Sequence, residues 1–182
     1  MTAFYIFIML LGLIVALYDM MFYKIPNILV LALTLLAIPH LVFFAKHDSL
    51  YLTLGISISF LMIGFICTRF GWMGAGDAKL LSVSALWVAP THIPAMILVM
   101  AIFGAFLALV YMTLGAQIDH LRKNLICFTH PLMSKIPVLK DYYQNEFIPS
   151  HSSHKLKTPI PYGVAISLAL VYILLIRIGA LS

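Results

Sequence analysis

Long apolar runs separated by short polar segments dominate the chain. Five of them are long enough for a transmembrane helix, which needs about 20 mainly apolar residues: residues 3–21, 27–45, 50–68, 94–117 and 160–178. A sixth run, residues 77–90, is short and reaches adequate length only if its helix begins near Met73. The pattern predicts an all-α integral membrane protein, a bundle of six transmembrane helices that forms a single domain over residues 1–182.

Composition strengthens this prediction, because 63% of the residues are apolar, only 9% are charged and the mean hydropathy is +1.07. These values lie far outside the range of soluble domains. The net charge of +5 comes from basic residues that lie between the apolar runs, so we expect membrane lipid headgroups as partners and no nucleic acid. The first apolar run lacks a basic segment before it and is long, which favours a permanent span over a cleaved signal peptide.

The basic residues predict the orientation, since Lys and Arg collect in cytoplasmic loops. With six spans, nine of the 11 fall on one side and only Lys46 and Arg177 on the other. Both termini are therefore expected outside, with the acidic residues Asp19 and Asp77 on the cytoplasmic face. Residues of about 118–158 are expected as a long cytoplasmic loop between helices five and six, because three prolines interrupt the segment.

Asp19 and Asp77 are the candidate catalytic residues. An ionisable side chain near the hydrocarbon is costly and therefore a functional candidate. Two neighbouring carboxyl groups share one proton, so that one can take a proton from water while the other donates to a peptide carbonyl oxygen. This chemistry needs no cofactor and no metal. His151 and His154 have a spacing that suits a metal, but no third ligand is evident.

Simpler roles stand beside this interpretation. Asp77 could cap the fourth helix, Asp19 could be an interfacial acid, and the glycines at Gly74 and Gly76 could serve only for helix packing. A small proton-coupled transporter and a non-catalytic assembly factor for pili or secretion are the alternative functions. The transporter would place its acids near mid-membrane and carry an internal repeat.

Three motifs in order along the chain resemble those of the type IV prepilin peptidase family, the GxGD membrane aspartic proteases. Residues 74–80 (GAGDAKL) are similar to the family's Gly-x-Gly-Asp-x-Lys-Leu signature. Residues 18–27 (YDMMFYKIPN) are similar to its first aspartate region, and residues 160–166 (IPYGVAI) to the segment that opens its last helix. The resemblance extends from the first span to the last.

The resemblance implies a multi-pass aspartic endopeptidase of the cell inner membrane. Such an enzyme removes the leader peptide from a prepilin or pseudopilin precursor at the cytoplasmic face, and Asp19 and Asp77 match its catalytic pair. Gly74 and Gly76 would let the substrate backbone lie close to the acids. Four further residues match motif positions, although snorkelling or helix entry would also explain them: Lys79, Pro161, Tyr162 and Gly163.

The chain is similar to the short form of the family, found in tight-adherence (Flp-type) pilus systems, with archaeal preflagellin peptidases as a related possibility. It has only two cysteines and lacks the cysteine tetrad of the members with two activities. It also lacks their cytoplasmic region before the first aspartate. We therefore expect leader cleavage without N-methyltransferase activity.

Overall fold

The computed structural model describes residues 2–44, 47–133 and 160–179, and all regular structure in these ranges is helical. The described helices are α1 (Thr2–Phe22), α2 (Asn27–Phe44), α3 (His47–Arg69), α4 (Ala75–Trp87), the short 3-10 helix η1 (Pro90–His92), α5 (Ile93–Met133) and α7 (Tyr162–Gly179). The expected all-α class is confirmed.

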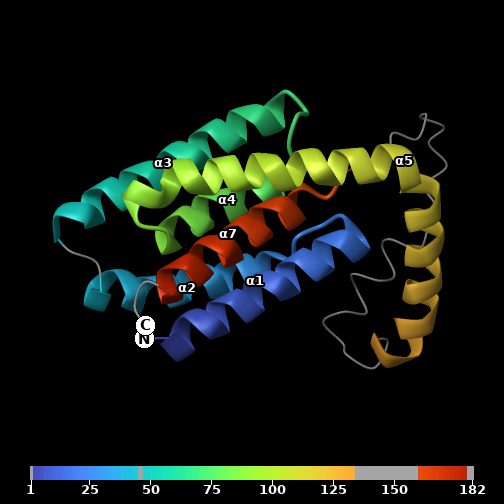
Figure 1. Cartoon of the computed structure of the whole chain (residues 1–182), viewed down its shortest axis with the longest axis horizontal. Helices are drawn as coiled ribbons and strands as arrows, with labels where there is room; N and C mark the ends of the chain where they lie inside the picture. Colours follow the sequence, from blue (N-terminus) through green and yellow to red (C-terminus); the bar gives the residue numbers. More distant parts are fainter. Residues whose placement is uncertain (1, 45–46, 134–159, 180–182) are drawn as a thin grey trace. The chain divides into compact units, whose positions relative to one another are not determined.

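The chain divides into two compact units, and the larger one comprises residues 1–108 and 160–182. In this unit α1 packs along α7 and α3 packs along α4, while α4 also contacts α7 and α2. Successive helices reverse direction, so α1 ends, α4 begins and α7 begins at the same end of the unit (Figure 1). The short helix α4 is thus surrounded by longer neighbours, and seven of its 13 residues are buried.

The α3–α4 contact depends on small residues. A Cβ atom added at Gly64 would lie 2.6 Å from Ala78 Cβ, so the two backbones are in close contact. Farther along, the Ser57 and Ser82 hydroxyls each donate to the other residue's carbonyl oxygen at 2.9 Å. Small residues and interhelical hydroxyl bonds are the usual means by which membrane helices associate.

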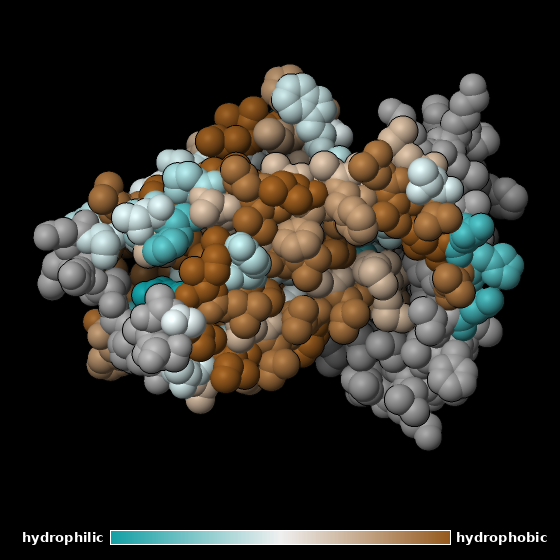
Figure 2. Space-filling view, viewed as in Figure 1, coloured by the Kyte–Doolittle hydropathy of each residue, from teal (hydrophilic) through white to brown (hydrophobic). Residues whose placement is uncertain are grey.

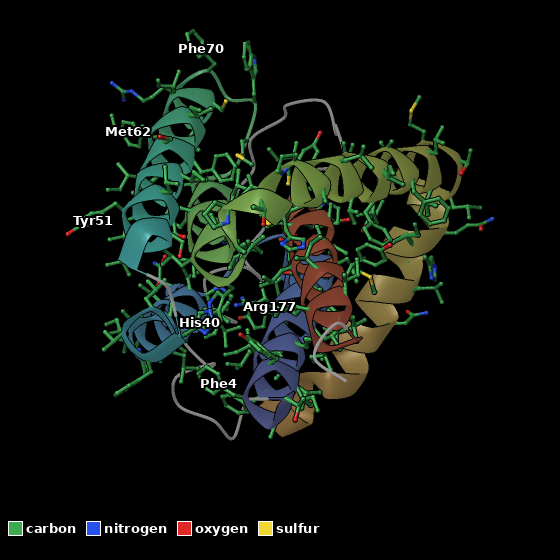
Figure 3. All side chains as sticks on the ribbon, turned by 60° about the vertical axis from the view of Figure 1, so that its left-hand side comes forward. Phe4, His40, Tyr51, Met62, Phe70 and Arg177 are labelled. Carbon is green, nitrogen blue, oxygen red and sulfur yellow. The ribbon has the colours of Figure 1, made fainter. Side chains whose placement is uncertain are left out.

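At the end of the unit away from Asp19, an aromatic cluster joins four helices. The His40 ring of α2 stacks on the Trp87 ring of α4 at 5.1 Å, and the Tyr5 ring of α1 meets His40 edge-on. The Arg177 guanidinium of α7 lies over the Tyr5 ring and donates to the Trp87 carbonyl oxygen at 3.3 Å. His40 and Arg177 lie close to each other inside the helix arrangement (Figure 3).

Four described helical segments are long and apolar enough to cross a membrane: Thr2–Phe22, Ser49–Arg69, Pro90–Gly115 and Tyr162–Gly179. Much of the visible surface over the helices is apolar (Figure 2). Large side chains point outward there, such as Tyr51 and Met62 on α3 and Phe70 directly after it (Figure 3). Such a surface suits a lipid environment. The protein is therefore a multi-pass membrane protein.

Helix α4 begins at Ala75, and Gly74, extended at φ −72°, ψ 147°, forms its N-cap, so the helix starts two residues after Met73. One sequence-based expectation needs correction. The segment expected as a loop from about residue 118 is helical as far as Met133, as part of α5. Its prolines lie at position 131 and beyond, so none interrupts residues 118–130. Residues 134–159, the rest of the expected loop, lie outside the described part.

Candidate active site

Asp19 lies in the last turn of α1 and is almost fully buried, with 3% of its surface exposed. The Val164 backbone N–H, in the first turn of α7, donates to Asp19 Oδ2 at 3.2 Å. The first N–H groups of a helix have no partner within it and carry the positive end of its dipole, so they favour a carboxylate. The start of α7 therefore holds Asp19 in place, although the two segments are far apart in sequence.

The chain turns sharply directly after α1. Tyr23 ends α1 in the left-handed conformation, with φ 51°, and its N–H donates to the Asp19 carbonyl oxygen at 2.8 Å. A residue in this conformation is a common way to end a helix. The turn carries the chain back past the acid to Ile25 and to Pro26, which precedes α2.

Asp77 is the third residue of α4 and also interacts with the helix start. Its Oδ2 accepts a hydrogen bond from the Gly74 backbone N–H at 3.3 Å, while the Ala78 N–H donates to the Gly74 carbonyl oxygen at 3.2 Å. Asp77 thus performs the capping role considered from the sequence. Capping uses only part of the carboxyl group, so it is compatible with a second role.

The backbone of Gly163 lies close to both acids. Its backbone N–H interacts with the carboxyl groups of both Asp19 and Asp77, and the two acids are close enough for the charge of one to act on the other. A Cβ atom at position 163 would lie 2.7 Å from Asp19 Oδ2 and 2.7 Å from Ile25 Cδ1. Only glycine lets the α7 backbone approach this closely.

This geometry brings together a residue from each of the three sequence motifs. The acid of α1, the acid of α4 and the glycine at the start of α7 come from segments spread over the length of the chain. A carboxyl pair in which Asp19 is buried and Asp77 half-buried, with access to a shared backbone donor, is suited to activating water for attack on a peptide carbonyl.

Residues 6–109 match the model of the type IV leader peptidase family. The chain belongs to this family. Its members are aspartic-type prepilin peptidases, so prepilins are the substrate class that the family implies. The matched segment contains both acids and ends before Gly163. A search of curated proteins and a search of solved structures each gave no match.

Gly74 and Gly76 both face atoms of this type IV leader peptidase itself. The space where a Gly74 Cβ would point is taken by Asp77 Oδ2, 2.9 Å away. At Gly76 a Cβ would lie 3.2 Å from Ile25 Cβ. The two glycines therefore let the Asp77 carboxyl and the turn after α1 pack against the start of α4. That they also let a substrate backbone lie close to the acids stays a prediction.

The sequence-based choice of site residues omitted Ile25. Its side chain packs against the positions where both Gly76 and Gly163 lack a Cβ atom, so it lies between the starts of α4 and α7. The only signal for it was its place in the KIPN segment that follows Asp19. An aliphatic residue in a turn carries no chemical signature of its own, and its role depends on contacts that the sequence does not reveal.

The remaining candidates lie around the acids in different ways. Lys79 is exposed, and its Nζ donates to Asn27 Oδ1 at 3.1 Å, which links the starts of α4 and α2. Pro161 is buried directly before α7, whereas Tyr162 is 42% exposed at the first position of that helix. Within the described ranges, no three His, Cys, Asp or Glu side chains come together to hold a metal ion. His151 and His154 lie outside those ranges.

Proposed function

We propose that Asp19 and Asp77 are the catalytic pair with which this type IV leader peptidase cleaves the leader from a prepilin. The observation that carries the proposal is that the carboxyl groups of both residues interact with the same backbone N–H, that of Gly163. Helix capping alone would not require the second acid. The arrangement therefore favours the dyad over the separate simpler roles.

In the proposed reaction one carboxyl group is ionised and the other protonated. The ionised group takes a proton from a water molecule, whose oxygen attacks the carbonyl carbon of the scissile peptide bond. The protonated group donates to the carbonyl oxygen. When the tetrahedral intermediate collapses, the leaving nitrogen receives a proton from the pair and the C–N bond breaks. The water oxygen remains in the new carboxyl group of the leader.

We further propose a cytoplasm-facing site in a bundle of six spans. The charge bias supports this orientation, because Lys24 and Lys79 belong to the side with nine basic residues. The reversal of successive helices supports it too, since Asp19, Asp77 and Gly163 lie at helix ends that share one end of the unit (Figure 1). Helix α4, with only 13 residues, would cross the membrane surrounded by its longer neighbours.

Leader removal without N-methylation, from a tight-adherence (Flp-type) prepilin, is the specific activity that we propose. The support is that residues 18–166, which carry the three motifs, contain only two cysteines and so no cysteine tetrad. Mass spectrometry of the mature pilin tests this proposal: a free N-terminal amine is expected, and an N-methylated one would contradict it.

Co-expression with an Flp-type prepilin tests the dyad. Asp19→Asn and Asp77→Asn are each expected to abolish leader removal, seen as a mobility shift of the prepilin, while the enzyme still accumulates in the membrane. Ser59→Ala is the matched control, because this exposed α3 hydroxyl donates to Gly55 O within its own helix. Continued cleavage by either Asp variant would exclude the dyad.

A further inference from the structure

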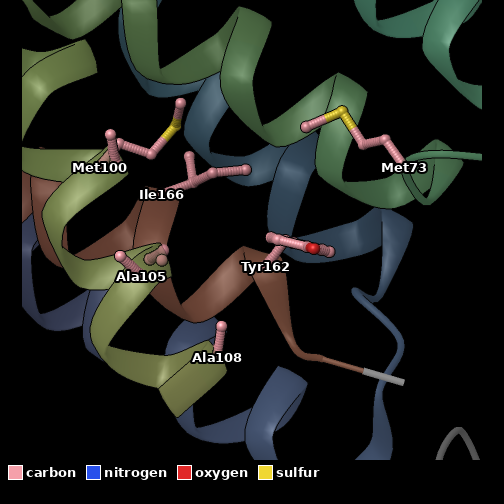
Figure 4. Close-up of a pocket in the computed structure, with 9 residues that line it drawn as sticks. Met73, Met100, Ala105, Ala108, Tyr162 and Ile166 are labelled. Atoms are coloured by element: carbon pink, nitrogen blue, oxygen red, sulfur yellow. The ribbon is translucent and has the colours of Figure 1, made fainter. Parts of the chain in front are cut away.

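An apolar groove of about 370 Å³ lies in the larger unit between the first part of α5 and the start of α7. Ala105 and Ala108 line it from α5 and Tyr162 and Ile166 from α7, while Met73 closes the side toward α4 (Figure 4). The Tyr162 hydroxyl is the one side-chain oxygen or nitrogen among the lining residues. The groove therefore suits an apolar occupant.

The α5 wall of the groove consists of small residues. Ala101, Gly104, Ala105 and Ala108 follow the i, i+3, i+4, i+7 spacing of one helix face, whereas the large exposed residues Leu98, Ile102 and Phe106 lie on another. Small residues in membrane helices let another backbone approach closely. Yet α5 is not among the closely packed helix pairs of the described part of the chain. At Gly104 this face meets α7, where an added Cβ would lie 3.9 Å from Ala165 Cβ, whereas Ala101 and Ala105 are exposed.

Two residues that line the groove are direct chain neighbours of residues that contact the acid pair. Tyr162 directly precedes Gly163, whose N–H interacts with both acids, and Met73 directly precedes Gly74, which bonds Asp77. Along α5 the groove extends from Met100 to Ala108, about 12 Å at about 1.5 Å per residue. This length matches about two turns of a helix that ends beside the acids.

We propose that this groove binds the apolar helix of the prepilin that follows the leader. The inference rests on the proposed function and adds the surface that positions the substrate. A helix face of small and aliphatic residues would pack against Ala101 and Ala105. The chain at its amino end would then extend past Tyr162, which places the leader junction at Asp19 and Asp77. A lipid chain also fits an apolar groove, but it would not require a wall of small residues.

Crosslinking tests the position of the substrate. A photoreactive residue is placed at Ala105, or at Phe106 as the control on another face of α5, in the Asp77→Asn variant co-expressed with prepilin. We expect an enzyme–prepilin adduct from position 105. Position 106 should give at least about tenfold less adduct, because it lies on a face of α5 outside the groove. An adduct of position 105 with lipid alone, or with a second copy of the enzyme, would overturn the proposal.

Filling the groove tests its function. Ala105→Leu is expected to slow leader cleavage at least about tenfold, because the added atoms occupy the space of the substrate helix, whereas Phe106→Leu stays within about twofold. The amount of enzyme in the membrane shows whether each variant folds. Unchanged cleavage by Ala105→Leu would refute the groove. Failure of the dyad proposal is distinguishable from this result, because it would appear as leader cleavage that persists in Asp19→Asn.

Discussion

Gly64 on α3 and Ala78 on α4 lie in such close contact that a Cβ atom at Gly64 would come within 2.6 Å of Ala78 Cβ. Ala78 directly follows Asp77, so this contact also sets the position of the acid relative to α3. The packing of two helices and the placement of a proposed catalytic group thus depend on the same pair of residues.

Gly64→Ala is expected to destabilise the protein by about 1 to 3 kcal/mol, the usual cost of overpacking, and to lower leader cleavage by displacing Asp77. Gly55 on the same helix provides the control, because nothing lies within 4 Å of its added Cβ. Gly55→Ala should change stability by no more than about 1 kcal/mol. Thermal unfolding in detergent and the prepilin mobility assay measure both effects. Equal behaviour of the two variants would contradict the packing argument.

Gly163→Ala should abolish or severely reduce cleavage while the protein remains folded. The added methyl group would lie 2.7 Å from Asp19 Oδ2, so either the acid or the start of α7 must move. Misplacement by about 1 Å can cost about a hundredfold in rate. Single-turnover cleavage compared with the melting temperature separates the two effects. A variant as active as the wild type would show that the α7 backbone need not approach the acid so closely.

Replacement of Arg177 should weaken the aromatic end of the unit. Arg177→Met removes the bond to the Trp87 carbonyl oxygen and the cation over the Tyr5 ring, for an expected loss of about 1 to 3 kcal/mol. Arg177→Lys keeps the charge but not the planar donor and should recover only part of the loss. Denaturation curves of the three proteins test the order. An Arg177→Met variant as stable as the wild type would show that the aromatic cluster does not depend on the Arg177 cation.

Ser57 and Ser82 are expected to be energetically coupled. Single and double replacement by alanine forms a double-mutant cycle, in which interhelical bonds of this kind in membranes contribute about 0.6 kcal/mol on average. The physical reason is that the two hydroxyl oxygens lie 3.0 Å apart, whereas the bonds to the carbonyl oxygens do not depend on the other residue's side chain. A coupling energy of zero would indicate that each hydroxyl finds an equally good partner after its neighbour is removed.

Lys79 should be dispensable for the chemistry. Its ammonium is exposed and donates a hydrogen bond to Asn27. An exposed pair of this kind contributes no more than about 0.5 kcal/mol to stability. Lys79→Gln is therefore expected to cleave prepilin at a rate within about threefold of the wild type, corresponding to less than about 1 kcal/mol. Inactivity equal to that of Asp77→Asn would instead indicate direct participation of the ammonium.

Much of the architecture could be predicted from the pattern of apolar residues, because long apolar runs have few alternatives in a membrane. The acids could also be located, since charged residues near hydrocarbon are few. The contacts of Ile25 and the spaces beside Gly74 and Gly76 could not, because they depend on how three distant helix starts meet. The extent of α5 was missed for another reason: the prolines that led to the expected loop over about 118–158 begin only at Pro131, so they leave residues 118–130 able to continue the helix.

The site receives nothing from Gly163 except backbone, and this has a consequence for comparing related sequences. Any other amino acid at this position adds at least a Cβ atom where the Asp19 carboxyl lies. A homologue that retains both aspartates but carries a side chain here is expected to be an inactive descendant, or to have shifted its last helix. Glycine at this position can therefore separate active peptidases from silent paralogues when the two aspartates alone do not.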